Sequence, residues 1–593
     1  MIIIVLVVSC KEQPVGNDGP TQEEILTQKA DSLLAMMTLE EKIGQMTQIR
    51  HFWDMENDTL VARKLIGSVI HTDGGNPGQT AADWQKRFNN LQRQALSTRL
   101  GIPLLFGVDA VHGQNTFDGA TIFPHNIGMG ATGDISLVER AAQITAIESR
   151  ATGFNWVFSP CVAVPFNERW GRVYEAFSED SAMVSAMTAA SIRGHQMNLS
   201  AGTSVMATAK HFIGDGATDY GKEGGNTAVS DSIMNNILLP PYRAAINNNV
   251  GAVMASFNAI DSLNMHAHKE LITDTLKNKL GFEGIVLTDW KGYSRFGRNA
   301  VVNAGVDMFM AVDGDMEVFQ QGVKRGVESD SISTARIDDA VRRILKKKFA
   351  LNLFEKPFAD SSLIKSIGSS KHRAVAREAV RNSMVLLKNE ILPLNKTDQK
   401  IVVVGEHANN SGLQSGGWTI RWQGREENYA GATTILQGFE KLAPGNVVYD
   451  QDASKKVKDA YVAVIVVGET PYAEFMGDVG HEVKKYQLTL TDVHKSYIKT
   501  YNDLDIPVVV VLISGRPLVV TEEIKKSAAF IAAWLPGSEG DGVAQVIMGE
   551  YDFKGKLPHS WPASTQDFKG KYGPNFWQHN VEPLYPLGYG LSY

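Results

Sequence analysis

The stretch Ile285-Val-Leu-Thr-Asp289-Trp290 joins a short apolar run directly to a carboxylate and a tryptophan. It is one of several such runs in the first half of the chain, and polar or Gly-rich stretches and helical segments separate them. Near-continuous apolar strands that alternate with helices predict a parallel sheet covered on both faces. About eight such units over ~310 residues predict a (β/α)8 barrel. The other runs are Ile43–Ile49, Ile66–His71, Ile102–Asp109, Asn155–Pro160, Val205–His211, Ala252–Asn258 and Val306–Ala311.

Polar side chains stand where several of these runs end. In a barrel the carboxyl ends of the strands meet at one mouth, which is where active sites of this fold lie. The intervening segments carry helical apolar spacing over Ala81–Arg99, Ile135–Thr152 and Ser181–Gln196. The strand-end residues that we expect at the mouth are Asp109, Lys210, His211, Asn258 and Asp289.

The second half of the chain predicts a smaller α/β sandwich with a mostly parallel open sheet. A segment with Pro357 and several serines precedes the sandwich, and its composition is typical of a linker. The boundaries that we expect are a tether over residues 1–24, a barrel over 25–354, a linker over 355–371 and the sandwich over 372–593. Its expected strands are Ile401–Val404, Tyr461–Val467, Pro507–Ile513 and Ala528–Leu535, and its expected helices are His372–Asn382, Asp492–Tyr501 and Gly542–Met548.

Composition excludes several classes of protein. Of 593 residues, 43% are hydrophobic and 21% are charged, which is ordinary for a globular protein and excludes wholesale disorder. The net charge of −7 argues against a sequence-independent nucleic-acid binder, which needs a basic face. Two cysteines cannot form a disulfide scaffold or a thiolate metal cluster.

The N-terminus, Met1-Ile-Ile-Ile-Val-Leu-Val-Val-Ser-Cys10, resembles the processing site of a bacterial lipoprotein. The run is far shorter than the ~20 residues that a membrane-spanning helix needs. A lipidated Cys10 followed by a polar, Pro- and Gly-containing segment would anchor the chain through a flexible tether. The location expected from this pattern is the bacterial cell envelope, as a periplasmic or outer-membrane lipoprotein. The alternative is a short buried strand.

Each of the polar segments could have a structural role instead of a functional one. Asp289 could cap a helix, and the arginines of Arg169-Trp-Gly-Arg172 could pair with structural glutamates. Lys210 and His211 are adjacent, so both reach one pocket only if the strand bends. A metal site formed by His211, Asp215 and Asp219 is disfavoured, because the lysine beside it would repel a cation.

Two further segments follow in the second half. Gly416-Gly-Trp418-Thr-Ile-Arg-Trp422-Gln-Gly places two tryptophans in a Gly-rich loop, where they suit stacking on sugar rings unless they are core residues. The loop Gly468-Glu469-Thr-Pro-Tyr-Ala-Glu474-Phe-Met-Gly-Asp478 offers three carboxylates and could equally be a solvated turn.

Taken together, these motifs resemble glycoside hydrolase family 3, and most closely its β-glucosidase and β-glucan exohydrolase branch. The likeness runs from about Ile25 to Tyr593. The motifs that carry it are Gly-Val-Asp109-Ala-Val-His112-Gly, Arg169-Trp-Gly-Arg172, Lys210-His211-Phe, Leu-Thr-Asp289-Trp290, Gly-Gly-Trp418-Thr-Ile-Arg-Trp422-Gln-Gly and Gly-Glu-Thr-Pro-Tyr-Ala-Glu474.

The resemblance implies a retaining, exo-acting β-glucosidase that releases glucose from β-linked gluco-oligosaccharides, with Asp289 as nucleophile and Glu474 as acid/base. No cofactor, metal or nucleic-acid partner is implied. Phe257 stands where the branch often has tyrosine, and Glu223 matches a sugar-contacting glutamate only with a one-residue shift. The residues that the resemblance assigns to substrate are Asp109, Arg172, Lys210, His211, Met254, Trp290, Arg295, Trp422 and Glu223.

The residues themselves agree with this chemistry. Retention needs one ionised and one protonated carboxyl group on either side of the scissile bond. We expect Lys210 and Arg295 to keep Asp289 anionic. Tyr472 and Phe475 are expected to desolvate Glu474 and raise its pKa, while Glu469 is expected to brace the loop.

Other functions remain as alternatives. A β-xylosidase of the same family is one. A β-N-acetylhexosaminidase is disfavoured, because the loop after Lys210-His211 lacks the second histidine of that branch. A non-catalytic glycan-binding lipoprotein would have lost a carboxylate, and none is lost. A nucleotide-binding second domain is weakly indicated by Ile401-Val-Val-Val-Gly405, since no G-x-G-x-x-G follows.

Overall fold

The computed structural model describes residues 19–50, 59–72, 79–395, 398–480, 487–568 and 582–593. Cys10 and most of the expected tether therefore lie outside the described residues. The first helix, α1 (Gln22–Leu34), is capped by Thr21, whose side chain and Glu24 form a reciprocal capping box. Residues 22–24 of the expected tether are thus helical, and α1 packs on α13 (Thr334–Ala350) of the barrel.

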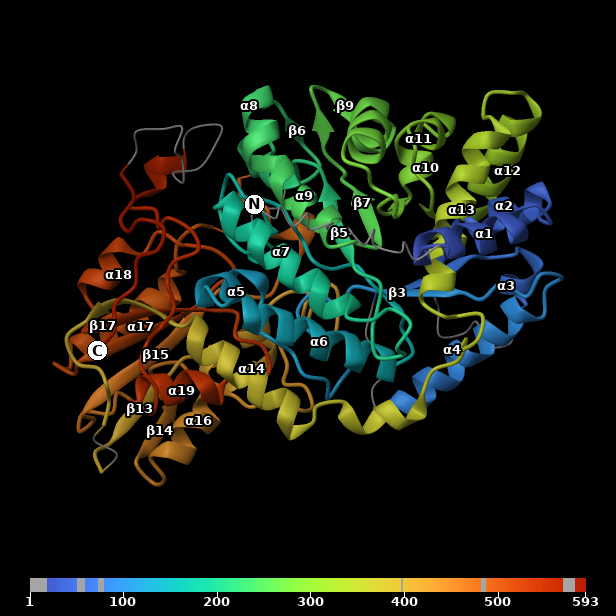
Figure 1. Ribbon diagram of the computed structural model, residues 1–593. Coiled ribbons are helices and arrows are strands. Elements are labelled where there is room, and N and C mark those ends of the chain that lie inside the picture. The colour runs from blue at the N-terminus through green and yellow to red at the C-terminus, as the bar shows by residue number, and fades with distance from the viewer. Residues whose placement is uncertain (1–18, 51–58, 73–78, 396–397, 481–486, 569–581) are drawn as a thin grey trace, which may run out of the picture.

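The first half of the chain is a closed barrel of parallel strands (Figure 1). One sheet has the order β11-β1-β2-β3-β4 and another the order β10-β7-β5. Parallel bridges between Trp156 and Met206 and between Leu287 and Met308 join the two sheets at both edges. Within the described residues this gives eight strands: β1 (Thr47–Arg50), β2 (Ser68–His71), β3 (Leu105–Val108), β4 (Trp156–Val157), β5 (Thr208–Phe212), β7 (Ala252–Ala255), β10 (Ile285–Leu287) and β11 (Phe309–Met310).

The predicted barrel is confirmed, and each strand falls within or beside an expected apolar run. The first run differs at its start: Ile43 belongs to helix α2 (Leu39–Gln45) rather than to a strand. The reason is local, because Thr38 and Glu41 form a capping box that starts a helix there.

Helices cover the outside of the barrel because each carries an apolar stripe. In α4 (Ala81–Leu96) the buried residues Trp84, Phe88, Leu91 and Ala95 recur at helical spacing. Helices α6 and α7 pack closely on each other. The further helices here are α3 (Leu60–Arg63), α5 (Asn126–Thr132), α6 (Ile135–Ala151), α7 (Ser181–Gln196), α9 (Leu239–Asn247), the π-helix η7 (Glu270–Lys279), α10 (Gly292–Arg295), α11 (Asn299–Asn303) and α12 (Asp315–Glu328).

The second half forms a sheet in the order β12-β17-β16-β15-β13-β14 among the described residues. All pairings are parallel except that of β12 with β17, so the predicted mostly parallel sheet is confirmed. Strands β12 and β14 and helix α16 were not predicted. The elements are α14 (Ser370–Ser383), β12 (Val385–Asn389), β13 (Ile401–Val404), α15 (Ser411–Ser415), α16 (Ile435–Leu442), β14 (Val447–Asp450), β15 (Val462–Gly468), α17 (Asp492–Asn502), β16 (Val508–Ile513), α18 (Thr521–Lys525), β17 (Ala529–Trp534) and α19 (Asp541–Ile547).

A loop that follows β15 crosses from the sandwich to the barrel. It contains the 3-10 helix η10 (Glu474–Gly477). Next to that helix, the Asp478 carboxylate accepts hydrogen bonds from the backbone N–H groups of Gly171 and Glu223 at 2.9 and 2.8 Å. Two residues of the barrel thereby fix the position of the loop. In the described part of the chain, no helix combines the length and the apolar character that a membrane span requires.

Candidate active site

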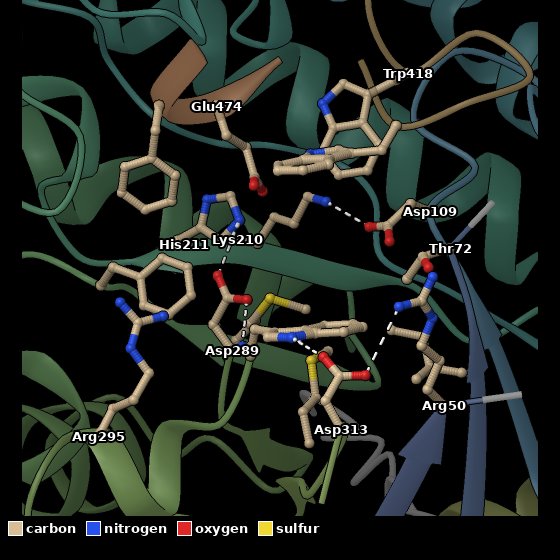
Figure 2. Close-up of a pocket in the computed structure, with 17 residues that line it drawn as sticks. Arg50, Thr72, Asp109, Lys210, His211, Asp289, Arg295, Asp313, Trp418 and Glu474 are labelled. Carbon is tan, nitrogen blue, oxygen red and sulfur yellow. Dashed lines mark hydrogen bonds and ion pairs between the residues drawn. The ribbon is translucent and has the colours of Figure 1, made fainter. Parts of the chain in front are cut away.

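A cavity of about 340 Å³ opens at the mouth of the barrel beneath the loops of the sandwich (Figure 2). Its size lies within the range of small-molecule sites, and its walls combine apolar surface with a few convergent polar groups. The residues that line it are Arg50, Ile70, Thr72, Asp109, Lys210, His211, Met254, Phe257, Asp289, Trp290, Arg295, Met310, Asp313, Trp418, Trp422, Glu474 and Phe475.

Asp289 stands at the carboxyl end of β10, two residues after the strand. Its Oδ1 accepts a hydrogen bond from the backbone N–H of Trp290 at 2.6 Å, which fixes the carboxylate. Burial raises the pKa of Asp289 to about 6, while that N–H and the cations Arg172 and Lys210 oppose the rise. A carboxyl group with this pKa is ionised near neutral pH and is held in one orientation, as a nucleophile requires.

Glu474 reaches the same cavity from the sandwich. Figure 2 shows its carboxyl group and that of Asp289 pointing into the cavity from opposite sides. Burial raises the pKa of Glu474 to about 7, Arg172 opposes the rise, and the Asp289 carboxylate adds to it. Of the two carboxyl groups, Glu474 has the higher pKa, and such a difference suits one group to donate a proton and the other to act as a nucleophile.

Arg172 lies behind Glu474 and does not line the cavity. Its side chain is buried, and its Nη1 donates to Glu474 Oε1 at 3.1 Å while Nε and Nη2 donate to the two oxygens of Glu175 at 2.8 and 2.9 Å. Burial alone would lower the pKa of this guanidinium, but Glu175, Glu474 and Glu223 raise it well above its ordinary value. Arg172 therefore stays charged and holds the Glu474 carboxyl group, and it is not among the residues that line the cavity.

Lys210 and His211 both face the cavity because β5 is bulged. Its pairing with β7 skips from Ala209 to Phe212, so the two residues between them are not held in regular alternation. Lys210 Nζ donates to Asp109 Oδ1 at 3.0 Å. Burial would lower the pKa of Lys210, but Asp109 and Glu175 raise it overall. The bend expected from the adjacent polar residues is present.

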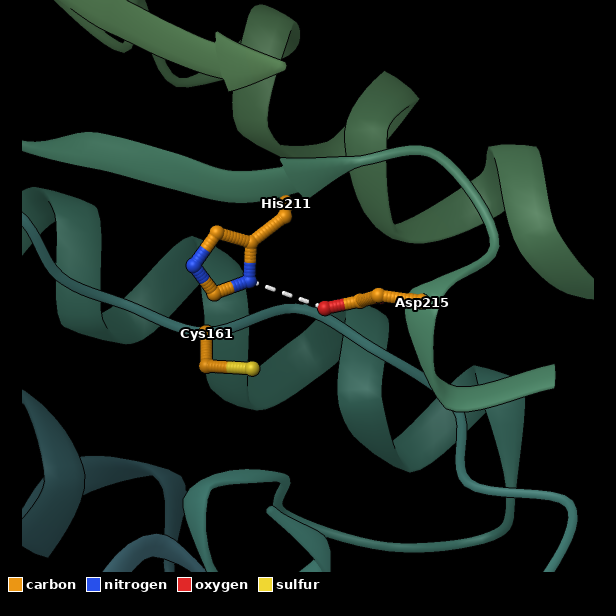
Figure 3. Close-up of side chains that lie close together, drawn as sticks. All are labelled: Cys161, His211 and Asp215. Carbon is orange, nitrogen blue, oxygen red and sulfur yellow. Dashed lines mark hydrogen bonds and ion pairs between the residues drawn. The ribbon is translucent and has the colours of Figure 1, made fainter. Parts of the chain in front are cut away.

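The imidazole of His211 has both nitrogens engaged. Arg172 Nη2 can only donate, so the contact of 3.2 Å makes Nε2 of His211 an acceptor. Nδ1 then carries the hydrogen and donates to Asp215 Oδ2 at 2.8 Å (Figure 3). Burial lowers the pKa of His211 well below its ordinary value, and Arg172 and Lys210 lower it further. His211 is thus a neutral ring whose Nε2 lies 4.0 Å from Asp289.

Aromatic side chains surround the outer part of the cavity. Trp422 is 38% exposed and Trp418 only 6%. Trp290 donates from its indole nitrogen to Asp313 at 3.0 Å, and the Arg50 guanidinium lies 5.6 Å from its ring. The outer wall therefore offers ring faces backed by a fixed charge pair, suited to stacking on a second sugar.

Glu223 and Arg295, both assigned to substrate by the resemblance, lie in different places: Arg295 lines the cavity and Glu223 does not. Glu223 is buried outside the cavity, where it accepts from the indole nitrogen of Trp170 at 2.5 Å and from Arg172 at 3.4 Å. Arg295 lines the cavity, but its guanidinium lies over Phe257 at 4.6 Å. The cations that lower the pKa of Asp289 are Arg172 and Lys210, of which Lys210 was expected to do so.

Several lining residues were not predicted. Arg50 ends β1, Thr72 follows β2 and Asp313 follows β11, so the strand-end rule applied above could have found all three. Trp418, for which stacking on sugar or a place in the core was expected, is buried and lines the cavity, and its indole nitrogen donates to Glu175 at 2.9 Å.

The sandwich loop is braced from behind. Both oxygens of Glu469 are engaged: Arg516 Nε donates to one at 3.0 Å, and the Gly515 N–H and the Tyr472 hydroxyl donate to the other at 3.0 and 2.9 Å. Glu469 therefore lies where a bracing residue would.

Comparison with known proteins places the chain in one family. Residues 38–347 match the glycosyl hydrolase family 3 N terminal domain and residues 384–593 its C-terminal domain. A lysosomal beta glucosidase of Dictyostelium discoideum is 30% identical, covering 95% of this chain and 75% of the relative. A periplasmic beta-glucosidase of Salmonella typhimurium is 29% identical, covering 95% of this chain and 80% of the relative. The crystal structure of an exo-1,3/1,4-beta-glucanase from a Pseudoalteromonas species superposes with a TM-score of 0.88 at 37% identity, covering 96% of this chain and 74% of the other.

Proposed function

Since the chain belongs to glycosyl hydrolase family 3 and is a glycoside hydrolase, we propose that it is a retaining, exo-acting β-glucosidase. The observation that carries the proposal is the pair of carboxyl groups in one cavity. Asp289 and Glu474 come from different halves of the chain, face the same space and have pKa values raised to about 6 and about 7. Near pH 6.5 the predominant state has an ionised Asp289 and a protonated Glu474.

The first step forms a glycosyl-enzyme. The Asp289 carboxylate attacks the anomeric carbon from one face, and Glu474 gives its proton to the glycosidic oxygen as that bond breaks. The aglycone leaves as an alcohol. Arg172, which holds Glu474 at 3.1 Å, keeps the acid in a fixed orientation through this step.

The second step reverses the roles. Glu474, now ionised, removes a proton from water, which attacks the anomeric carbon and breaks the ester to Asp289. Two inversions at one carbon retain the β configuration of the released glucose.

The placement of the polar and aromatic residues supports exo action. Asp109, Lys210 and His211 are each more than nine-tenths buried at the inner end of the cavity. There their charged and polar groups can bind the hydroxyls of a terminal glucose, with Met254 nearby. Trp290 and Trp422 line the outer part, where they would hold the next ring.

The test is hydrolysis of a panel of β-1,2-, β-1,3-, β-1,4- and β-1,6-linked glucose disaccharides, with aryl β-glucoside, aryl β-xyloside and aryl β-N-acetylglucosaminide beside them. We expect glucose release, with the aryl glucoside cleaved faster than the other two aryl glycosides. Proton NMR of the first product should show the β anomer. A preference for the xyloside, or first release of the α anomer, would contradict the proposal.

We further propose that the protein is held in the cell envelope by a lipid on Cys10. The Ser9-Cys10 pattern with the polar segment after it supports this, as does the similarity to a periplasmic enzyme. In a Gram-negative host, Cys10→Ser should move the protein from the membrane fraction to the soluble fraction, and mass spectrometry of the intact wild type should find the acyl chains. Membrane association that is unchanged by the substitution would argue against the anchor.

A further inference from the structure

The sandwich holds a second cluster of polar side chains away from the cavity. His407 and Glu406 lie in the 3-10 helix η9 (Glu406–Asn409), just after β13, and His494 lies in the first turn of α17. One ligand atom from each of the three side chains lies within 4.8 Å of the others. The two imidazole rings are 5.4 Å apart at 78°.

The hydrogen bonding of His407 leaves one nitrogen open. Its Nε2 lies 3.1 Å from the backbone oxygen of Glu469, and a carbonyl oxygen can only accept. Nε2 therefore carries the hydrogen, and Nδ1 keeps its lone pair. Among the described residues, Nδ1 of His407 and Nδ1 of His494 are both buried without a hydrogen-bond partner.

Two such buried ring nitrogens are unusual, because burying a polar atom without a partner costs free energy. His407 is fully buried and His494 is 7% exposed. A third group that both nitrogens could contact, with the hydrogen of His494 on Nε2, would remove this cost. A metal ion does so, since metal-bound histidines characteristically donate their other nitrogen to a backbone carbonyl, as His407 does.

Electrostatics around the cluster favour a cation. Glu406 is exposed, so a carboxylate stands at the solvent side of the two rings.

We propose that Glu406, His407 and His494 bind a divalent transition-metal ion, with Zn²⁺ the best fit. Two imidazole nitrogens and one carboxylate oxygen form a ligand set that Zn²⁺ accepts, with water completing a tetrahedron. The exposed Glu406 gives the ion a path from solvent.

The cluster Cys161, His211 and Asp215 (Figure 3) does not offer the same chemistry. Both nitrogens of His211 are already hydrogen bonded, and the Arg172 guanidinium lies 3.2 Å from one of them. Burial also raises the pKa of the Cys161 thiol, which disfavours the thiolate that a metal needs.

A metal at the second cluster would act on the loop that carries the acid. His407 is bonded to the backbone of Glu469, and the chain runs from there to Glu474. Fixing the His407 ring fixes this hydrogen bond, so the bound ion would be a structural brace for the loop. None of the three ligands touches the cavity.

The experiment uses the full chain, stripped with EDTA and dialysed. Calorimetric titration with ZnCl₂ should give one site per chain, and Co²⁺ should give the visible absorption of a tetrahedral site. Glu406→Gln and His494→Gln should each weaken Zn²⁺ binding at least tenfold and remove the Co²⁺ spectrum. His268→Gln, which changes a half-buried histidine outside the cluster, should leave both unchanged.

Because Glu406 is exposed, Glu406→Gln should keep the fold, which circular dichroism checks, so its loss of binding is interpretable. The proposal is overturned if the stripped wild type binds no Zn²⁺ up to 1 mM. It is equally overturned if Glu406→Gln and His494→Gln bind Zn²⁺ as the wild type does, or if His268→Gln loses binding to the same extent.

Discussion

Replacing Glu474, the proposed acid, should affect substrates differently according to their leaving groups. In Glu474→Ala the cavity keeps Asp289, so the nucleophile remains, but no group protonates the glycosidic oxygen. The leaving group of a disaccharide is a sugar alkoxide, which needs that proton. The leaving group of a dinitrophenyl glucoside is dinitrophenolate, which does not. We therefore expect disaccharide hydrolysis to fall by about 10²–10⁴-fold, the usual contribution of a general acid. The glycosyl-enzyme should still form from the dinitrophenyl glucoside.

The surroundings of Glu474 determine how much of this carboxyl group is protonated at the working pH. Its pKa is raised from an ordinary 4.5 to about 7, chiefly by burial. At pH 6.5 a carboxyl group with a pKa near 7 is roughly three-quarters protonated, against about 1% for one with a pKa of 4.5. The protein thus keeps the acid in its working form. Because the working form is lost as pH rises through about 7, the wild type should lose activity there.

The assay compares kcat/KM against pH for a glucose disaccharide and for the dinitrophenyl glucoside. Glu474→Ala should lose the basic limb of the profile, and added azide should restore breakdown of the glycosyl-enzyme. Glu474→Gln, which keeps the shape of the side chain, is the matched control for packing and should behave in the same way. Glu482, a carboxylate eight positions after Glu474 in the sequence and outside the described residues, is the rival candidate for the acid. The reasoning is refuted if Glu474→Ala cleaves disaccharides normally while Glu482→Ala shows the azide rescue.

Three further results are expected. Trp422→Ala should raise KM for disaccharides roughly 5- to 150-fold, since stacking on an aromatic ring contributes about 1–3 kcal/mol; a similar rise for an aryl glucoside would show that Trp422 is structural. Wild-type kcat/KM should fall as pH drops through about 6, because Asp289 must be ionised to attack; activity undiminished at pH 4.5 would contradict this. Arg516→Met should lower the free energy of unfolding, measured with urea, by about 3–5 kcal/mol, because it leaves the Glu469 carboxylate buried without its cation; a change below 1 kcal/mol would show that Glu469 needs no such partner.

The positions of the barrel strands in the sequence were predictable because each strand is a short apolar run. The candidate site residues were predictable because polar residues stand at the C-terminal ends of these runs. Asp289, Lys210 and His211 follow from this rule alone. Helix α16 could also have been found, since Thr434 and Gln437 form a capping box at its start. Strand β14 carries no such signal, because it is short and only partly buried.

The remainder of the site depends on contacts between distant segments. Arg172 and Glu474 are hydrogen bonded although 302 positions separate them. Nothing in the sequence near Arg172 indicates that its guanidinium lies behind the acid, or that Arg295 turns to the Phe257 ring. Such placements depend on how the sandwich loop docks on the barrel, which the Asp478 hydrogen bonds decide.

The most direct test of the central claim, that Asp289 is the nucleophile, is to trap the glycosyl-enzyme with an activated 2-deoxy-2-fluoro-β-glucoside. The fluorine slows both steps, and the reactive leaving group lets the first proceed, so the ester accumulates. Peptide mass spectrometry should then find the fluoroglucosyl group on Asp289 of the wild type and no label in Asp289→Asn. Label on another carboxylate, or equal labelling of Asp289→Asn, would contradict the account.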